Sequence, residues 1–458
     1  MKHSLLSLPL AAALSLSAFA QSALTLAPAP PLGWNSWDSY GLTITEPQFK
    51  ANVAWFHQHL QPYGWQYVVV DEGWYLAHPD DSKAPGFTLS PNGRYLPAPN
   101  RFPSAGETEG FKPLADYVHS LGLKFGIHII RGIPRQAVAR NLPIADSPYR
   151  ALAAADTSDT CRWNSDNYGV RDNAAGQAYY DSIIQLYASW GVDFLKVDCI
   201  SSPYKAASIH MIDAAIKKSG RPIVLSLSPG PTPLSEAADV SRSAQLWRIS
   251  NDFWDLWSSL HGANSFPQSL KNQFPLLAQW EPYAGIKDGS GRWPDADMLP
   301  IGYLGPHPGW GKPRHSRFTP AETRTLITLW SIARSPLILG ANLTQMDPAT
   351  ESLLTNPEVL AVDQHTTGNH AVATAIKNGN IVFWTAREGS DPIIAVFNRS
   401  DRPARVITPP WKKLGSQFGL DRTTYKVRDL WQRKDLGPRR SLSVTLPPHG
   451  AALFRLNP

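Results

Sequence analysis

Short apolar runs alternate with helix-like stretches along most of this chain, and no other feature of the sequence constrains the fold as strongly. The runs at 67–71, 125–130 and 194–198 are mostly apolar and β-branched or aromatic, which is typical of strands buried on both faces of a sheet. Further strands are expected at 32–37, 223–228, 246–249, 297–302 and 337–340, and helices at 46–60, 111–121, 177–190, 206–218 and 320–334. About eight strand–helix units over roughly 330 residues predict a closed (β/α)8 TIM barrel, an α/β fold.

An open, doubly wound sheet is the rival architecture. We disfavour it because no glycine-rich phosphate loop joins a strand to the next helix, and because polar residues end nearly every strand. From about residue 368 the helical pattern stops, and short strand-like runs separated by turns predict an antiparallel β-domain. The expected domains are therefore a catalytic barrel at 28–362 and a β-domain at 368–458, with long pocket-shaping loops at 79–103 and 133–176.

The first 20 residues have the three parts of a secretory signal peptide. A positive charge at Lys2 precedes an apolar run, and the run ends on Ala18-Phe19-Ala20, a small-residue cleavage site. We therefore expect a secreted or periplasmic protein whose signal peptide spans 1–20, without a later membrane span. Export permits disulfides, and Cys161 and Cys199 can bridge the long loop to the end of a strand.

The composition limits the partners of the chain. The formal net charge is +6, but lysines and arginines are scattered, so we do not expect nucleic acid binding. The 17 tryptophans pack a core and are also suited to stack on sugar rings. Because no His/Cys set has zinc spacing and no Gly-x-Ser-x-Gly motif occurs, we expect no metal and no cofactor. The sequence carries no signal for a particular oligomeric state.

Polar side chains follow nearly every expected strand. In a barrel, the carboxyl ends of the strands surround one cavity, and active sites of this fold lie there. The side chains concerned are Trp37, Asp71, Glu72, His128, Lys196, Asp198, Ser228, Arg248, Asp252, Asp295 and Asp297. A structural ion pair or a helix cap explains any one of them equally well. Together, paired carboxylates and aromatic walls are what glycoside hydrolysis requires.

Six ordered motifs carry a resemblance to a known family. They are Leu32-Gly-Trp-Asn-Ser-Trp37, Val70-Asp-Glu-Gly-Trp74, Leu195-Lys-Val-Asp198, Trp247-Arg248 with Asp252, Trp293-Pro-Asp-Ala-Asp-Met298 and Pro336-Leu-Ile-Leu-Gly340. Together they resemble glycoside hydrolase family 27, the family of α-galactosidases and α-N-acetylgalactosaminidases. The resemblance covers most of the chain after residue 20. It implies a (β/α)8 barrel followed by an antiparallel β-sandwich, and a double displacement with retention of configuration.

The resemblance also implies roles for single residues. Asp198 matches the nucleophile, Asp252 the general acid/base and Arg248 the arginine that precedes it. Lys196 shares a strand face with Asp198, so we expect it to keep that carboxylate ionised and to bind a ring hydroxyl. The other matches are expected to line the sugar pocket, namely Trp37, Asp71 and Asp297.

Four positions depart from the family pattern. Glu72 stands where typical α-galactosidases have Asp, and its extra methylene is expected to intrude on the space of the galactose hydroxymethyl group. This Glu resembles the pattern of β-L-arabinopyranosidases, whose sugar is galactose without that carbon. Ser228 is small enough to leave room for an N-acetyl group at the 2-position, and His128 replaces a common Tyr. Cys199 lies one residue earlier than the usual disulfide cysteine, so its pairing with Cys161 stays open.

We expect a secreted exo-glycosidase that removes terminal α-D-galactose from oligosaccharides or polysaccharides. The alternatives with the same chemistry act on β-L-arabinopyranose or α-N-acetylgalactosamine. A non-catalytic carbohydrate-binding protein is the alternative from another class, although such a protein needs neither Asp198 nor Asp252. A nucleotide-dependent oxidoreductase is a more distant alternative.

Overall fold

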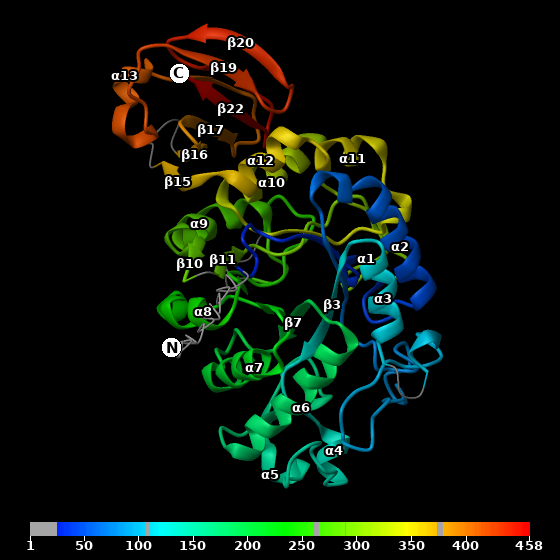
Figure 1. Cartoon of the computed structure of the whole chain (residues 1–458). Helices are drawn as coiled ribbons and strands as arrows, with labels where there is room; N and C mark the ends of the chain where they lie inside the picture. The colour runs from blue at the N-terminus through cyan, green and yellow to red at the C-terminus, as the bar shows by residue number, and fades with distance from the viewer. Residues whose placement is uncertain (1–24, 107–109, 260–264, 289, 373–378) are drawn as a thin grey trace, which may run out of the picture.

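The structure is a computed structural model that describes residues 25–106, 110–259, 265–288, 290–372 and 379–458. The expected signal peptide at 1–20 lies outside these residues. The described chain forms a barrel domain and a C-terminal β-domain, drawn orange to red in Figure 1, which lies beside helices α10 (Pro320–Ala333) and α12 (Pro357–His365). No helix in the described ranges is long and apolar enough to cross a membrane.

A curled nine-stranded sheet forms the barrel. Its strands, in chain order, are β1 (Leu32–Asn35), β2 (Tyr67–Val70), β3 (Lys124–Ile130), β7 (Phe194–Asp198), β8 (Val224–Leu227), β9 (Leu246–Arg248), β10 (Gly285–Lys287), β11 (Ser290–Asp295) and β14 (Leu337–Leu339). All pairs are parallel except β10 with β11, and β14 returns to pair with β1. A parallel bridge between Leu299 and Leu339 links the chain after β11 to β14 and closes the ring. The predicted (β/α)8 barrel is confirmed.

Helices follow the strands and cover the outside of the sheet. They are α1 (Trp37–Tyr40), α2 (Glu46–His59), α3 (Lys112–Ser120), α6 (Ala174–Trp190), α7 (Ala206–Ser219), α8 (Ala237–Ser243), α9 (Leu270–Trp280), α10, α11 (Pro348–Leu354) and α12. The first residues of α10 show how the sequence determines where a helix begins. Thr319 and Glu322 form a capping box, and Pro320 occupies the first turn.

The strand expected at 297–302 is wrong. The seventh parallel strand of the barrel is β11, which ends at Asp295, and Leu299 contributes only an isolated bridge. Asp297 has a φ of 87°, which an extended strand does not allow, so the chain leaves the strand conformation there. The apolar run after Asp297 lies in the wall of the barrel without forming a regular strand.

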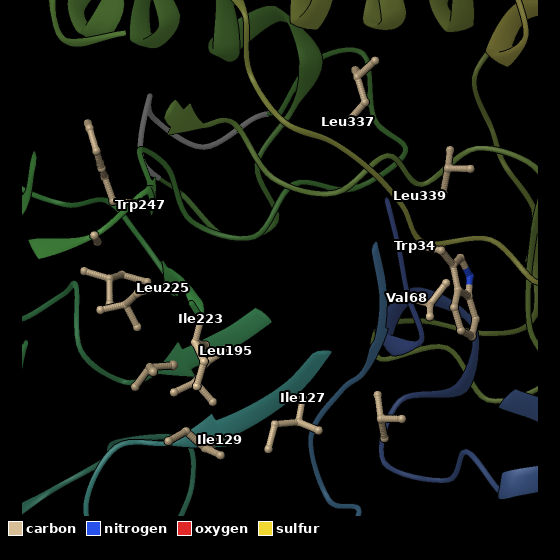
Figure 2. Close-up of a cluster of buried hydrophobic side chains, with 14 of the residues drawn as sticks. Trp34, Val68, Ile127, Ile129, Leu195, Ile223, Leu225, Trp247, Leu337 and Leu339 are labelled. Carbon is tan, nitrogen blue, oxygen red and sulfur yellow. The ribbon is translucent and has the colours of Figure 1, made fainter. Parts of the chain in front are cut away.

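Successive side chains of each strand point alternately out of and into the barrel, and this alternation separates the outer core from the site. Side chains of one set, including Trp34, Leu195 and Leu225, point outward and pack against the helices; Figure 2 shows part of this cluster. The alternate set, including Phe194 and Val224, forms a small core inside the barrel. Polar residues therefore lie on the inward face only toward the carboxyl ends of the strands, where they meet in one place.

The long loop predicted at 133–176 has regular structure of its own. It contains β4 (Ile133–Pro134), α4 (Arg135–Ala139), α5 (Ala151–Ala154), β5 (Ala155–Thr160) and β6 (Asn167–Val170), and its strands pair in the order β4-β6-β5. The small sheet supports the segment between β5 and β6, which reaches the strand ends of the barrel.

The C-terminal domain is antiparallel, as predicted. A six-stranded sheet contains β15 (Thr367–Val372), β16 (Ile381–Glu388), β17 (Asp391–Asn398), β22 (Ala451–Asn457), β19 (Tyr425–Asp429) and β20 (Lys434–Arg439), and a second sheet contains β18 (Ala404–Ile407) and β21 (Ser443–Leu446). A short helix, α13 (Trp411–Leu414), lies between β18 and β19 in sequence. The domain is tied to the barrel by hydrogen bonds such as that from Thr325 Oγ1 to the His449 carbonyl oxygen, 2.5 Å.

Candidate active site

A cavity of about 960 Å³ opens at the carboxyl ends of the barrel strands. All ten side chains that the sequence placed in a catalytic or sugar-binding role line it: Trp37, Asp71, Glu72, His128, Lys196, Asp198, Ser228, Arg248, Asp252 and Asp297. The wall at Trp37 is packed tightly, because a Cβ at Gly309 would come within 2.3 Å of the indole ring. The fold thus brings these residues together from seven different barrel strands or the turns that follow them.

Asp71 forms a buried ion pair at the floor of the cavity. The Lys196 ammonium lies 2.9 Å from Asp71 Oδ2, and Asn35 Nδ2 donates a second hydrogen bond to the same oxygen at 2.6 Å. Burial disfavours the charged carboxylate, but the positive charges of Lys196 and His128 outweigh it and hold the pKa of Asp71 below its ordinary value. Asp71 is therefore an ionised acceptor for sugar hydroxyls.

Lys196 was expected to support Asp198 by its charge, and its direct partner is another carboxylate. Both side chains lie on the inward face of β7, but the direct ion pair of Lys196 is with Asp71 on the neighbouring side of the cavity. Lys196 acts on Asp198 only through its field. Asp71 raises the pKa of Lys196 against the effect of burial, so the ammonium stays charged.

Three other side chains contact Asp198 directly. Trp163 Nε1 donates to Oδ1 at 2.9 Å, while Ser228 Oγ and His128 Nε2 lie 3.4 and 3.5 Å from Oδ2. Burial lowers the pKa of His128, but Asp71 and Asp198 reverse this and raise it. Contacts on both oxygens orient the Asp198 carboxylate, as a nucleophile requires.

Arg248 organises the opposite wall. One guanidinium nitrogen lies 2.7 Å from Asp297 and 3.1 Å from Asp252. Asp297 also accepts a hydrogen bond from the Phe253 amide, 2.7 Å, so it fixes the turn that carries Asp252. Burial raises the pKa of Asp297 to about 7 despite Arg248, and the nearby Asp252 and Asp295 add to this effect.

Glu72 projects into the cavity beside Asp71. Its Oε1 accepts a hydrogen bond from Asn164 Nδ2 at 2.7 Å. Burial raises the pKa of Glu72 to about 7; His128 opposes the rise, and the negative charges of Asp198 and Asp71 add to it. Glu72 is therefore a carboxyl group whose charge changes near neutral pH.

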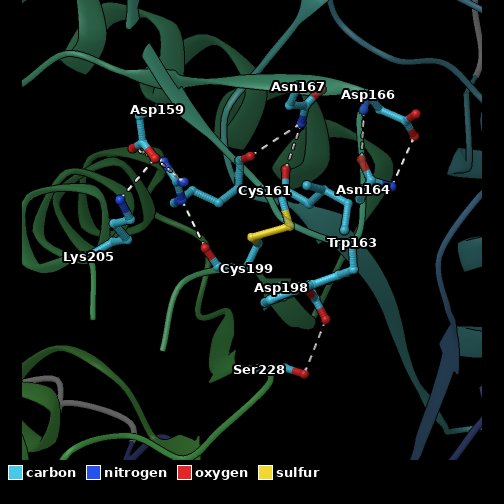
Figure 3. The surroundings of a disulfide bond; sticks show 12 residues. Asp159, Cys161, Trp163, Asn164, Asp166, Asn167, Asp198, Cys199, Lys205 and Ser228 are labelled. Atoms are coloured by element: carbon cyan, nitrogen blue, oxygen red, sulfur yellow. Dashed lines mark hydrogen bonds and ion pairs between the residues drawn. A yellow bond between two sulfur atoms is a disulfide. The ribbon is translucent and has the colours of Figure 1, made fainter. Parts of the chain in front are cut away.

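Sequence reasoning missed the residues that hold these carboxylates. Trp163 and Asn164 lie on an irregular segment between β5 and β6, where no periodicity marks them. The one available signal was Cys161, which forms a disulfide with Cys199 directly after Asp198 (Figure 3). Asp38 also lines the cavity, and burial raises its pKa well above the ordinary value, with the negative charge of Asp297 as the next cause.

No cluster of three or more His, Cys, Asp or Glu side chains within the described ranges is arranged to hold a metal ion. The side chains at this site offer carboxyl groups, cations that can bind hydroxyls, and aromatic walls.

Comparisons with known proteins match both domains of the chain. The family model described as "Alpha galactosidase A" matches residues 168–365, and the model of the "Alpha galactosidase C-terminal beta sandwich domain" matches residues 378–456. A β-L-arabinopyranosidase of glycoside hydrolase family 27 from Geobacillus stearothermophilus has a solved structure that is 44% identical, with a TM-score of 0.86, and the match covers 94% of this chain and 97% of that one.

More distant curated relatives cover equally long stretches. Alpha-galactosidase A of Cellvibrio japonicus is 28% identical over 474 residues, which include 100% of this chain and 99% of that protein. Alpha-N-acetylgalactosaminidase of Gallus gallus is 25% identical and covers 94% of both. Barrel, cavity and relatives together define an enzyme of the glycoside hydrolase class. Within that class, the chain belongs to glycoside hydrolase family 27.

Proposed function

We propose that the chain is a retaining exo-glycosidase that hydrolyses terminal β-L-arabinopyranosides in preference to α-D-galactosides. The observation that carries this choice is Glu72, a carboxyl group that lines the cavity and is held there by Asn164. β-L-Arabinopyranose has the ring and hydroxyl configuration of α-D-galactopyranose but lacks the hydroxymethyl group. A glutamate in place of an aspartate fills the space of that group and favours the smaller sugar.

The similarity to the Geobacillus β-L-arabinopyranosidase supports the same choice, because it extends over nearly the whole of both chains. α-D-Galactosides are the second candidate, since several curated relatives are α-galactosidases that match 94% or more of this chain. α-N-Acetylgalactosaminides also stay a candidate, because Ser228 is small and lines the cavity.

In the proposed mechanism, Asp198 attacks the anomeric carbon while the glycosidic C–O bond breaks. Trp163 and Ser228 orient the carboxylate for this attack. Asp252 gives its proton to the leaving-group oxygen, and a covalent glycosyl–Asp198 ester forms. Asp252 then takes a proton from water, the water oxygen attacks the anomeric carbon, and Asp198 leaves, so configuration is retained.

The residues around this pair bind the sugar. The ionised Asp71 and the Lys196 ammonium provide an acceptor and a donor for ring hydroxyls at the cavity floor. Arg248 contacts both Asp252 and Asp297 and thereby sets the distance of the acid/base from the sugar. Trp37 offers an apolar ring face to the sugar.

Trapping tests the double displacement. A 2-deoxy-2-fluoro-β-L-arabinopyranosyl donor with a good leaving group should form a stable ester, and peptide mapping should find the added mass on the peptide that contains Asp198. Asp198→Asn should accept no label. Label on another residue, or an Asp198→Asn variant as active as the wild type, would refute the assignment.

The exchange Glu72→Asp tests the choice of sugar. Shortening the side chain by one methylene should lower kcat/KM for p-nitrophenyl β-L-arabinopyranoside relative to the α-D-galactoside by about tenfold, the order of effect that one methylene has on the fit of a substrate. Asp80→Glu, at an exposed position outside the cavity, is the matched control. An unchanged ratio in Glu72→Asp would remove Glu72 as the determinant.

We also propose that the protein is exported and loses residues 1–20. The tripartite pattern of this segment supports the proposal. Intact mass of the protein purified from its natural source should match a chain that begins at Gln21, and a chain that begins at Met1 would contradict export by this route.

A further inference from the structure

One short segment, residues 161–166, contacts both the expected nucleophile and the residue that selects the sugar. We propose that this positioning segment determines specificity, with Asn164 as the positioning residue that holds Glu72 in the sugar pocket. The inference rests on the proposed function only for the direction of the preference. That Asn164 controls Glu72 is a separate statement, and it can be tested separately.

The Asn164 amide has a single orientation because every polar atom of it is used. Its Oδ1 accepts a hydrogen bond from the Asp166 amide at 2.8 Å. Its Nδ2 then faces Glu72, to which it donates at 2.7 Å, and also donates to Asp166 Oδ2 at 3.2 Å. Figure 3 shows this local turn, with Asn164 and Asp166 bonded to each other. The N–H group therefore points at Glu72 before any substrate binds.

Asp166 connects this turn to the rigid part of the molecule. Its Oδ2 accepts a hydrogen bond from the Tyr75 hydroxyl at 2.6 Å, and Tyr75 is buried and stacks on Tyr95 with the ring centroids 3.9 Å apart. The Tyr95 hydroxyl donates to Asn167, whose Nδ2 donates to the carbonyl oxygen of Ile130 at the end of β3. The turn is thus braced from the barrel and does not depend on solvent-exposed contacts.

The other end of the positioning segment is fixed at the nucleophile. Cys161 is joined by the disulfide to Cys199, which follows Asp198. Trp163 lies between Cys161 and Asn164, and its indole N–H donates to Asp198 at 2.9 Å. A displacement of the segment would therefore move the supports of Asp198 and Glu72 together.

The charged groups near Glu72 give the hydrogen bond from Asn164 an effect on the pKa of Glu72. The positive charge of His128 favours the ionised form of Glu72, and the negative charges of Asp198 and Asp71 repel it. The amide of Asn164 is the hydrogen-bond donor that stabilises that form, so it lowers the pKa of Glu72 against the effect of burial. Without the amide, Glu72 loses its anchor and leaves the space that excludes a hydroxymethyl group.

The test compares kcat/KM for p-nitrophenyl β-L-arabinopyranoside and α-D-galactoside in wild type, Asn164→Ala and Asn164→Asp. Asn164→Asp keeps the shape and the acceptor for the Asp166 amide but replaces the donor by a second carboxylate. Both variants should change the ratio of the two kcat/KM values toward the galactoside by about tenfold, the effect of losing one hydrogen bond to a charged group. Arg162→Ala, at an exposed position of the same segment, should leave the ratio unchanged.

Two further measurements distinguish a role of Asn164 in positioning Glu72 from a purely structural role. In a Glu72→Asp background, where the shorter side chain no longer meets the amide, Asn164→Ala should not change the ratio further. In the wild type, the ratio should change with pH around a midpoint near 7, and Asn164→Ala should move that midpoint upward.

An unchanged ratio in both Asn164 variants overturns the inference, and so does an equal change in the Glu72→Asp background. If instead the wild type prefers the galactoside, the proposed function fails. The role of Asn164 is still tested in that case. It is supported if Asn164→Ala changes the ratio in the wild type but not in the Glu72→Asp background, and it is overturned if the change is equal in both.

Discussion

Replacing Glu72 by Gln should make the stability of the protein less dependent on pH. The pKa of Glu72 is raised from its ordinary value of 4.5 to about 7 in the folded protein. Below pH 4.5 the side chain is protonated in both the folded and the unfolded state, so no stability is lost. Between pH 4.5 and 7 the unfolded state ionises first, and the folded state becomes less stable relative to it as pH rises.

The size of the effect follows from the shift. A difference of 2.5 pKa units, at about 1.4 kcal/mol each, costs the folded wild type about 3 kcal/mol above pH 7. Glu72→Gln cannot ionise and avoids this cost. Its free energy of unfolding, relative to the wild type, should therefore increase by up to about 3 kcal/mol between pH 4.5 and pH 7.5.

Urea unfolding of both proteins at pH 4.5, 6 and 7.5 measures this difference directly. Asp80→Asn, at an exposed position, is the control and should show no comparable trend. A difference between Glu72→Gln and wild type that stays constant over the three pH values would refute the account of Glu72 as a buried carboxyl group that ionises near neutral pH.

Three further substitutions test the supports of the site. Trp163→Phe keeps a ring but removes the N–H that Asp198 accepts, so kcat/KM should fall at least tenfold, while an unchanged value would exclude a role for this contact. Lys196→Met leaves Asp71 buried without its ion pair, and urea unfolding should find a loss of about 3–5 kcal/mol. Cys161→Ser removes the disulfide, and thermal unfolding should find a loss of about 2–4 kcal/mol together with a lower kcat; equal stability would show that the bridge is dispensable.

The barrel and the location of the site were predictable because the physics is local to each strand. The period of two places Lys196 and Asp198 on the inward face of β7, and the parallel arrangement brings Asp71 and Arg248 to the same end. The motif spacing then selected the family. None of these inferences needs a contact between distant segments to be known in advance.

The contacts between those residues were not predictable in the same way. Lys196 was expected to support Asp198 by its charge, but its direct ion pair with Asp71, at 2.9 Å, was not predicted. Nothing local distinguishes these two carboxylates as partners, because both lie on inward faces of the sheet. The choice depends on the three-dimensional distance between neighbouring strands.

The positioning segment was missed for a different reason. Asn164 reaches Glu72 from a position 92 residues later in the chain, and the segment has no periodic pattern. Its geometry is set by a local turn, a disulfide and a tyrosine stack, which only the folded chain brings together. The strand at 297–302 failed for a local reason, since the left-handed backbone of Asp297 has no signature in the residue sequence.

The measurement that tests the central claim most directly is the ratio of kcat/KM for β-L-arabinopyranoside to that for α-D-galactoside in the wild-type enzyme. Both substrates carry the same p-nitrophenyl leaving group, so the ratio compares the two sugars and not two leaving groups. We expect this ratio to exceed one at pH 7 by about tenfold or more. A ratio below one would contradict the claim that Glu72 excludes the hydroxymethyl group.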